Sequence, residues 1–200
     1  MKNFIYIFSI FICNALFGDS PLTSTEFYKA YEYHPIVQKA MQCNGEISEE
    51  LMSFLSDSTN GLELKLASIN ALGWNIDGTD NSIRYKKFCE LNYGINDIAL
   101  ANADIIICYA YLKALDNYFD VYDAFEFAQI AKTKKSNSYS IGIICALIEA
   151  QIKLDDFDNW CSVYQALRIV LDDESLNDDM SSEAVDMIME YISSYEEYCN

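Results

Sequence analysis

The chain has 200 residues, of which 52% are hydrophobic and 14% aromatic, and its formal net charge is −18. This length suits a single domain with a buried core, and the composition excludes the polar, aromatic-poor signature of disorder. The surplus of carboxylates repels phosphate backbones and anionic lipid surfaces, so nucleic-acid binding and attachment to such membranes are disfavoured.

The first predicted element is a secretory signal peptide over residues 1–18. The positively charged start Met1-Lys2-Asn3 is followed by the apolar run 4–17, and small residues stand near its end. A helix of that length spans about 21 Å, less than the roughly 30 Å hydrocarbon core of a bilayer. These features are typical of a signal peptide, with cleavage after Ala15 or Gly18. An uncleaved anchor is the alternative, and the bulky Ile12 before Cys13 disfavours a lipoprotein signal.

Residues 19–200 are therefore expected to form one soluble domain in the periplasm or outside the cell. No later segment is long and apolar enough to span a bilayer, so we do not expect an integral membrane protein after signal cleavage. The chain has no Asn-x-Ser/Thr sequon, which favours a bacterial periplasm over a glycosylating secretory pathway.

Helical periodicity and capping residues predict helices along this whole domain, and no segment alternates as a strand does. Thr23-x-x-Glu26 has the form of a capping box and predicts a helix to about Tyr33. The helix is expected to resume at Pro35 after His34, and Ser48 is expected to cap the next one. Further helices are predicted over residues 62–74, 82–92, 98–117, 120–134, 138–154, 158–171 and 182–198.

The apolar pattern of these helices indicates how they pack. The helix at 98–117 is hydrophobic on all sides, which is typical of a central helix. The last helix is expected to bury one stripe, made of Val185, Ile188, Met189, Ile192 and Tyr195. The fold class is therefore predicted to be all-α.

Three times, a mainly apolar helix is followed by a more amphipathic one, and these pairs start at residues 62, 98 and 138. A spacing of about 36 to 40 residues lies in the range of helical solenoids, so stacked helical hairpins with a C-terminal capping helix are predicted. The spacing Ala124-x-x-x-Ala128-x-x-Ala131 resembles that in the second helix of tetratricopeptide-like repeats. The resemblance covers residues 62–171 and implies a groove for peptides or protein surfaces, but it transfers no binding residue.

Six cysteines follow the predicted signal peptide. In an oxidising compartment they are able to form disulfides, although Cys108 and Cys145 stand inside apolar helical runs, where a thiol behaves as a small hydrophobe. We expect at most one or two disulfides and buried free thiols for most of the others, with the pairing left open.

The sequence contains no catalytic motif, cofactor motif or metal-binding motif. His34 is the only histidine, and its place before proline indicates a turn residue. The loop 75–81 has the oxygen ligands that calcium prefers but departs from the EF-hand pattern, so Asx turns and a helix cap are favoured. With 31 acidic residues, some pair of carboxylates is expected at the distance that glycoside hydrolysis requires. A carboxylate-based hydrolase of the envelope is therefore the alternative function.

The candidate binding residues lie in the strongly acidic last part of the chain, where residues 155–200 contain 13 acidic residues and one basic residue. Tyrosine offers rigid contact area with a polar tip, and carboxylates attract a basic partner. The prediction is a protein-interaction module, such as an immunity or adaptor protein, that binds a basic protein. There are two competing interpretations. The tyrosines pack between helices, and the acidic residues belong to a solvated loop. The candidates are Tyr191, Tyr195, Tyr198, Asp172, Asp173 and Glu174.

Overall fold

A computed structural model describes residues 20–199, and the predicted signal peptide lies outside them. All regular elements of the described residues are helical, apart from one isolated bridge between Ser138 and Asn177. The fold is all-α, as the sequence predicts. The elements are η1 (Phe27–Tyr31), α1 (Pro35–Met41), α2 (Glu49–Ser56), α3 (Leu62–Leu72), α4 (Asn81–Tyr93), η2 (Ile98–Leu100), α5 (Ala103–Asp116), α6 (Tyr122–Lys134), α7 (Tyr139–Lys153), α8 (Cys161–Leu171), α9 (Ser182–Ile192) and η3 (Ser193–Cys199).

Local signals set several helix ends. The Ser48 hydroxyl accepts a hydrogen bond from the Leu51 amide at 3.3 Å and caps α2. His34 caps α1 through its imidazole nitrogen, and Pro35 occupies the first helical position. Gly94 ends α4 with a φ of 66°, a left-handed conformation that glycine adopts without strain. These predicted boundaries are confirmed.

The predicted capping box at Thr23 is wrong. The Thr23 hydroxyl lies 3.0 Å from the Ser20 hydroxyl, and the amides of Thr23 and Ser24 both donate to the Ser20 carbonyl. Because this turn uses the groups that would have started a helix, only the short η1 forms after it. The predicted helix at 98–117 is also divided, since Asn102 caps α5 after the separate turn of η2.

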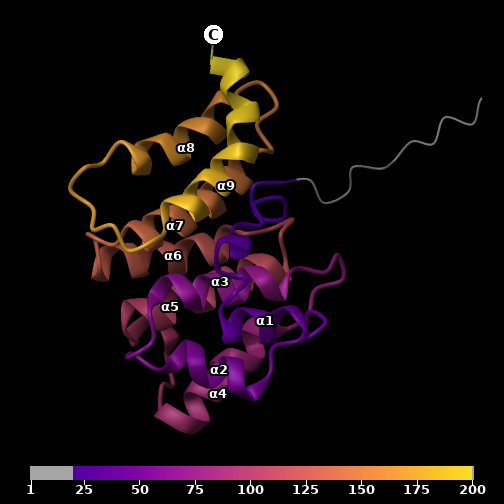
Figure 1. Ribbon diagram of the computed structural model, residues 1–200, viewed down its shortest axis with the longest axis vertical. Coiled ribbons are helices and arrows are strands. Elements are labelled where there is room, and N and C mark those ends of the chain that lie inside the picture. Colours follow the sequence, from indigo (N-terminus) through magenta and orange to yellow (C-terminus); the bar gives the residue numbers. More distant parts are fainter. Residues whose placement is uncertain (1–19, 200) are drawn as a thin grey trace, which may run out of the picture.

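The core is centred on α5 and α7. Ile106, Ile107 and Cys108 of α5 are completely buried, as the all-round apolar pattern predicts. α5 packs against α6, and α7 packs against α8, while α4 packs mainly against α5 and α2. Figure 1 shows the helices arranged along the long axis, with α2 and α4 at one end and α8 and the C-terminus at the other.

The N-terminal segment packs against the C-terminal helix. η1 lies against α3 and α9, and the Phe27 ring stacks on Tyr111 of α5 with centroids 6.4 Å apart. The Tyr31 hydroxyl accepts a hydrogen bond from the Ser181 amide at 2.9 Å and donates one to Glu63. Residues that are 150 positions apart in sequence therefore share one buried contact.

Two aspartates cap helices that lie far from them in sequence. The Asp116 carboxylate accepts from the Asn81 and Ser82 amides at 3.1 and 2.7 Å, at the start of α4. The Asp179 carboxylate likewise accepts from the Ser140 amide at 2.7 Å and from the Ser138 hydroxyl at 2.6 Å, at the start of α7. Both contacts place a negative charge at the positive end of a helix dipole and attach a long loop to the core.

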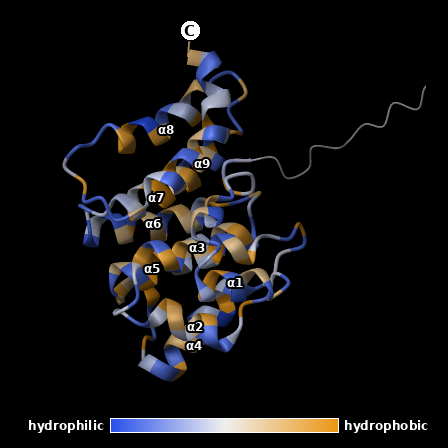
Figure 2. Ribbon diagram, viewed as in Figure 1, coloured by the Kyte–Doolittle hydropathy of each residue, from blue (hydrophilic) through white to orange (hydrophobic). Residues whose placement is uncertain are grey.

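Within residues 20–199, no helix combines the length and the apolar character needed to cross a bilayer. Figure 2 shows hydrophobic and hydrophilic residues alternating around the helices, and the loop between α8 and α9 as predominantly hydrophilic.

Candidate functional site

The three candidate tyrosines belong to one group of aromatic rings at the C-terminal end of the molecule. The Tyr191 and Tyr195 rings lie 5.7 Å apart, with their hydroxyls 2.9 Å from each other. Trp160, which precedes α8, contacts Tyr195 and Tyr198 edge-on at 6.2 and 5.1 Å. The Phe157 ring is a third neighbour of Trp160, with the ring centroids 6.1 Å apart. These five residues are called the C-terminal aromatic cluster below.

A disulfide between Cys161 and Cys199 holds this cluster together, because it joins the start of α8 to the end of η3. The other cysteines of the described residues are free: Cys89, Cys108 and Cys145 are buried, and Cys43 is partly exposed. Burial raises the pKa of the Cys108 thiol to about 12 and that of Cys145 to about 11. One bridge and mostly buried free thiols agree with the prediction for this part of the chain.

The cluster presents aromatic area to solvent, and acidic residues flank its members in the sequence. The Phe157 side chain is 79% exposed and Tyr198 is 47% exposed. Asp155, Asp156 and Asp158 lie in the same loop as Phe157, and Glu196 and Glu197 lie beside Tyr198 in η3. The pKa of nearby Tyr164 is raised by burial and by a hydrogen bond with Glu196.

The candidate acids Asp172, Asp173 and Glu174 lie at the other end of α8. α8 has 11 residues and is therefore about 16 Å long, so the acids and the tyrosines do not form one site. Asp172 forms an ion pair with Arg168. The Asp173 carboxylate accepts hydrogen bonds from the Ser175 hydroxyl and amide at 2.5 and 3.0 Å, and these lower its pKa.

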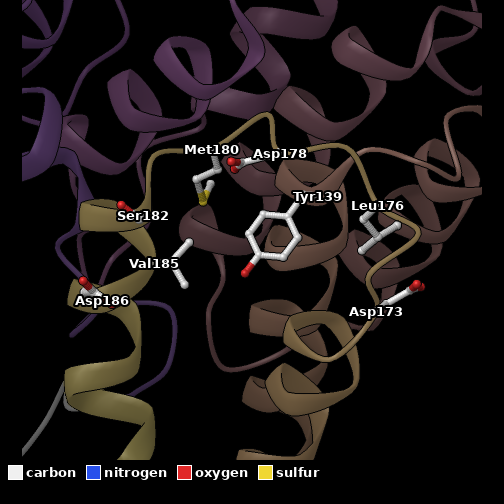
Figure 3. Close-up of a pocket in the computed structure, with 8 residues that line it drawn as sticks. All are labelled: Tyr139, Asp173, Leu176, Asp178, Met180, Ser182, Val185 and Asp186. Atoms are coloured by element: carbon white, nitrogen blue, oxygen red, sulfur yellow. The ribbon is translucent and has the colours of Figure 1, made fainter.

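Asp173 also lies at the edge of a pocket of about 240 Å³. The pocket is formed by the start of α7, the α8–α9 loop and the first turns of α9, and Figure 3 shows Tyr139 at its centre. We call it the Tyr139 pocket. Its lining consists of Tyr139, Asp173, Leu176, Asp178, Met180, Ser182, Val185 and Asp186.

Comparison with protein-family models, with curated proteins and with solved structures finds no match for this chain. The interpretation of the site therefore depends on its geometry and chemistry.

The loop at 75–81 forms the turn and helix start that the sequence favours. The Asp77 amide donates to the Asn75 side chain at 3.0 Å, which is an Asx turn, and Asp116 holds the start of α4. Among residues 20–199, no three His, Cys, Asp or Glu side chains come close enough together to hold a metal ion.

General acid catalysis by a carboxyl group requires a raised pKa, because the group must keep its proton near neutral pH. Hydrogen bonds from the Ser175 hydroxyl and amide lower the pKa of Asp173, and those from the Thr59 amide and hydroxyl lower the pKa of Asp57. Both carboxyl groups are thereby stabilised in their ionised form, which suits attraction of a cation better than proton transfer.

The candidate residues that the sequence indicates include three tyrosines of the cluster but not Trp160, Phe157 or Tyr139. A tryptophan directly before Cys161 is a usable signal, because large aromatic residues concentrate at contact surfaces. Tyr139 carried no such signal, since the residues that surround it come from a loop and a helix about 35 to 47 positions later.

Proposed function

We propose that this protein is an exported interaction module that binds a basic protein partner through the C-terminal aromatic cluster and the carboxylates around it. An immunity or adaptor protein is the specific form that this proposal favours. Its main support is the exposure of Phe157 and Tyr198 beside Trp160, with acidic residues on both flanking segments. Exposed aromatic anchors inside a charged rim are typical of binding surfaces.

The Cys161–Cys199 bridge supports export, because disulfides persist in oxidising compartments such as the bacterial periplasm. It also supports a binding role for the cluster, since a fixed end of η3 reduces the entropy lost when a partner binds. The signal peptide over residues 1–18 belongs to the same proposal. If export occurs, sequencing of the secreted or periplasmic protein gives an N-terminus at Leu16 or Asp19.

The binding test uses the full chain as bait in the envelope fraction of its source cells, with matched variants. Phe157→Ser and Tyr198→Ser remove exposed aromatic area from the cluster. Tyr93→Ser is the control, because Tyr93 is 48% exposed, like Tyr198, and lies on α4 at the opposite end of the molecule from the cluster (Figure 1).

The expected result is one basic protein, recovered in equal molar amount with the wild type and with Tyr93→Ser. The Phe157→Ser and Tyr198→Ser baits should lose most of it, and 0.5 M salt should weaken capture because electrostatic attraction is screened. Recovery of no basic partner, or equal recovery by the cluster variants, contradicts the proposal.

A further inference from the structure

The Tyr139 pocket combines an aromatic and apolar interior with an acidic edge. In Figure 3 Leu176 lies on one side of the Tyr139 ring, and Met180 and Val185 lie on the other. In the same view the carboxylates of Asp173 and Asp186 lie on opposite sides and that of Asp178 lies beside Met180, and the residues that line the pocket include no basic side chain. Burial, followed by the charge of Asp178, raises the pKa of Tyr139, and the charge of Arg168, which is paired with Asp172, lowers it by less.

The walls of this pocket are held in place by contacts outside it. The Asp179 carboxylate binds the start of α7, and the Asn177 amide donates to the Asn137 carbonyl at 2.7 Å. At the other end of the loop, the Ser181 amide is bound by the Tyr31 hydroxyl. The loop is thus attached to two core elements, and the pocket exists before a ligand arrives, which lowers the cost of binding.

The size of the pocket indicates a single side chain. Its volume of about 240 Å³ lies below the roughly 300–1,000 Å³ that is typical of small-molecule sites. The apolar walls suit an aliphatic stem, and the acidic edge suits a positive charge at the end of that stem.

The three carboxylates lie apart from one another in Figure 3, and this arrangement favours some cations over others. They do not form a metal-binding group, since no such group exists within residues 20–199. An extended cation is able to approach separated carboxylates and to stack on the tyrosine ring at the same time. The planar guanidinium of arginine meets these conditions better than the compact ammonium of lysine.

We propose that the Tyr139 pocket binds an arginine side chain of the partner protein. This inference rests on the proposed function, because that function supplies the partner protein to which the arginine belongs. Binding of arginine by the pocket itself is testable without any partner. The pocket lies at the start of α9, and Tyr191 of the C-terminal aromatic cluster lies in the last turn of the same helix, so one partner covering α9 reaches both.

The test titrates the full chain with Nα-acetyl-arginine amide and follows methyl and aromatic NMR signals. Saturable shifts are expected at Tyr139, Leu176, Met180 and Val185. Nα-acetyl-citrulline amide, which has nearly the shape of the arginine probe but no charge, should bind at least about tenfold more weakly. Nα-acetyl-lysine amide should bind about threefold more weakly than the arginine probe.

Two matched variants locate the site. Asp186→Asn removes a carboxylate from the edge of the pocket and should weaken arginine binding about two- to fivefold, the effect expected of an exposed ion pair. Glu190→Gln removes a carboxylate one helical turn further along α9, outside the lining, and should leave binding unchanged. Both side chains are exposed, so neither change disturbs the core.

Equal binding of the arginine and citrulline probes would overturn the inference, as would shifts spread over other acidic surfaces. Equal binding of the lysine probe would overturn the assignment to arginine. Failure of partner capture together with saturable arginine binding rejects the proposed partner surface and leaves the pocket's chemistry standing. Successful capture without arginine binding rejects the pocket alone.

Discussion

Lys65 of α3 is a completely buried basic residue. Its ammonium nitrogen has no hydrogen-bond partner, and its ion pair with Asp104 is 3.8 Å long. Asp104 also pairs with the half-exposed Lys135 at 3.2 Å. The buried ammonium therefore loses its hydration and recovers only part of that cost from one distant carboxylate.

Replacing Lys65 and replacing Asp104 should have opposite effects on stability. Lys65→Met keeps the packing volume and removes the desolvation cost, so the free energy of unfolding should rise by about 1 kcal/mol. Asp104→Asn leaves the ammonium buried without a counter-charge and should lower it by about 3 kcal/mol. Urea denaturation of both variants measures these changes. A loss of stability in Lys65→Met as large as that in Asp104→Asn would contradict this interpretation.

At the scale of single residues, helical periodicity accounts for the contact between two candidate tyrosines but not for their other neighbours. Tyr191 and Tyr195 are four residues apart, so helical geometry alone brings their rings together. The contact with Trp160 depends on the disulfide, and six cysteines allow many pairings that the sequence leaves open. Lys65 stands among apolar neighbours in the sequence, and only the fold shows that it is buried.

At the scale of elements, the disulfide holds η3 on α8. Cys161 and Cys199 are 38 residues apart, and closing a loop of that length stabilises a chain by about 4 kcal/mol in the loop-entropy model. The segment inside this loop contains α8, α9 and most residues of both candidate surfaces, whereas Tyr139, Phe157 and Trp160 precede it in the sequence.

Reduction of the bridge should lower the free energy of unfolding by about 2–4 kcal/mol. Thermal melts with and without dithiothreitol measure the change, and a Cys161→Ser/Cys199→Ser double variant should be insensitive to the reductant. Cys43→Ser is the control, because Cys43 is a free, partly exposed thiol, and this variant should respond as the wild type does. An equal melting temperature of oxidised and reduced wild type would show that the bridge does not stabilise the fold.

Helix boundaries were predictable wherever a neighbouring residue determines them, as at Ser48, Pro35 and Gly94. The two aspartate caps were not, because Asp116 and Asp179 act on helices that begin about 35 to 40 residues earlier. Turns attached in this way depend on tertiary contacts, which periodicity and capping patterns do not report. The same limit applies to α4, whose packing against α2 and α5 no local pattern indicates.

At the scale of the whole molecule, buried tyrosines link stability to alkaline pH. Burial raises the pKa of Tyr31 to about 12 and also raises the pKa of Tyr85 and Tyr111 above the ordinary value of 10.0. The folded chain keeps these protons at a pH at which the unfolded chain has lost them. Rising pH therefore favours the unfolded chain.

The free energy of unfolding should be unaffected by these tyrosines below pH 10 and should fall as the pH rises from 10 to 12. Urea midpoints at pH 9, 10 and 11 measure the slope. Tyr31→Phe should make the decline shallower, although it also removes the hydrogen bond to Ser181. A midpoint that stays constant from pH 9 to 11 would contradict the burial of these phenols.

The contact between η1 and α9 also sets the earliest point during synthesis at which folding is able to finish. Tyr31 emerges from the ribosome long before Ser181, and translation at about 5–20 residues per second separates the two by about 8–30 s. During that interval the beginning of the chain lacks the helix that covers it. Such a delay suits the export proposed above, because a polypeptide whose first segment is not yet covered by its last helix remains unfolded enough to pass through a translocation channel.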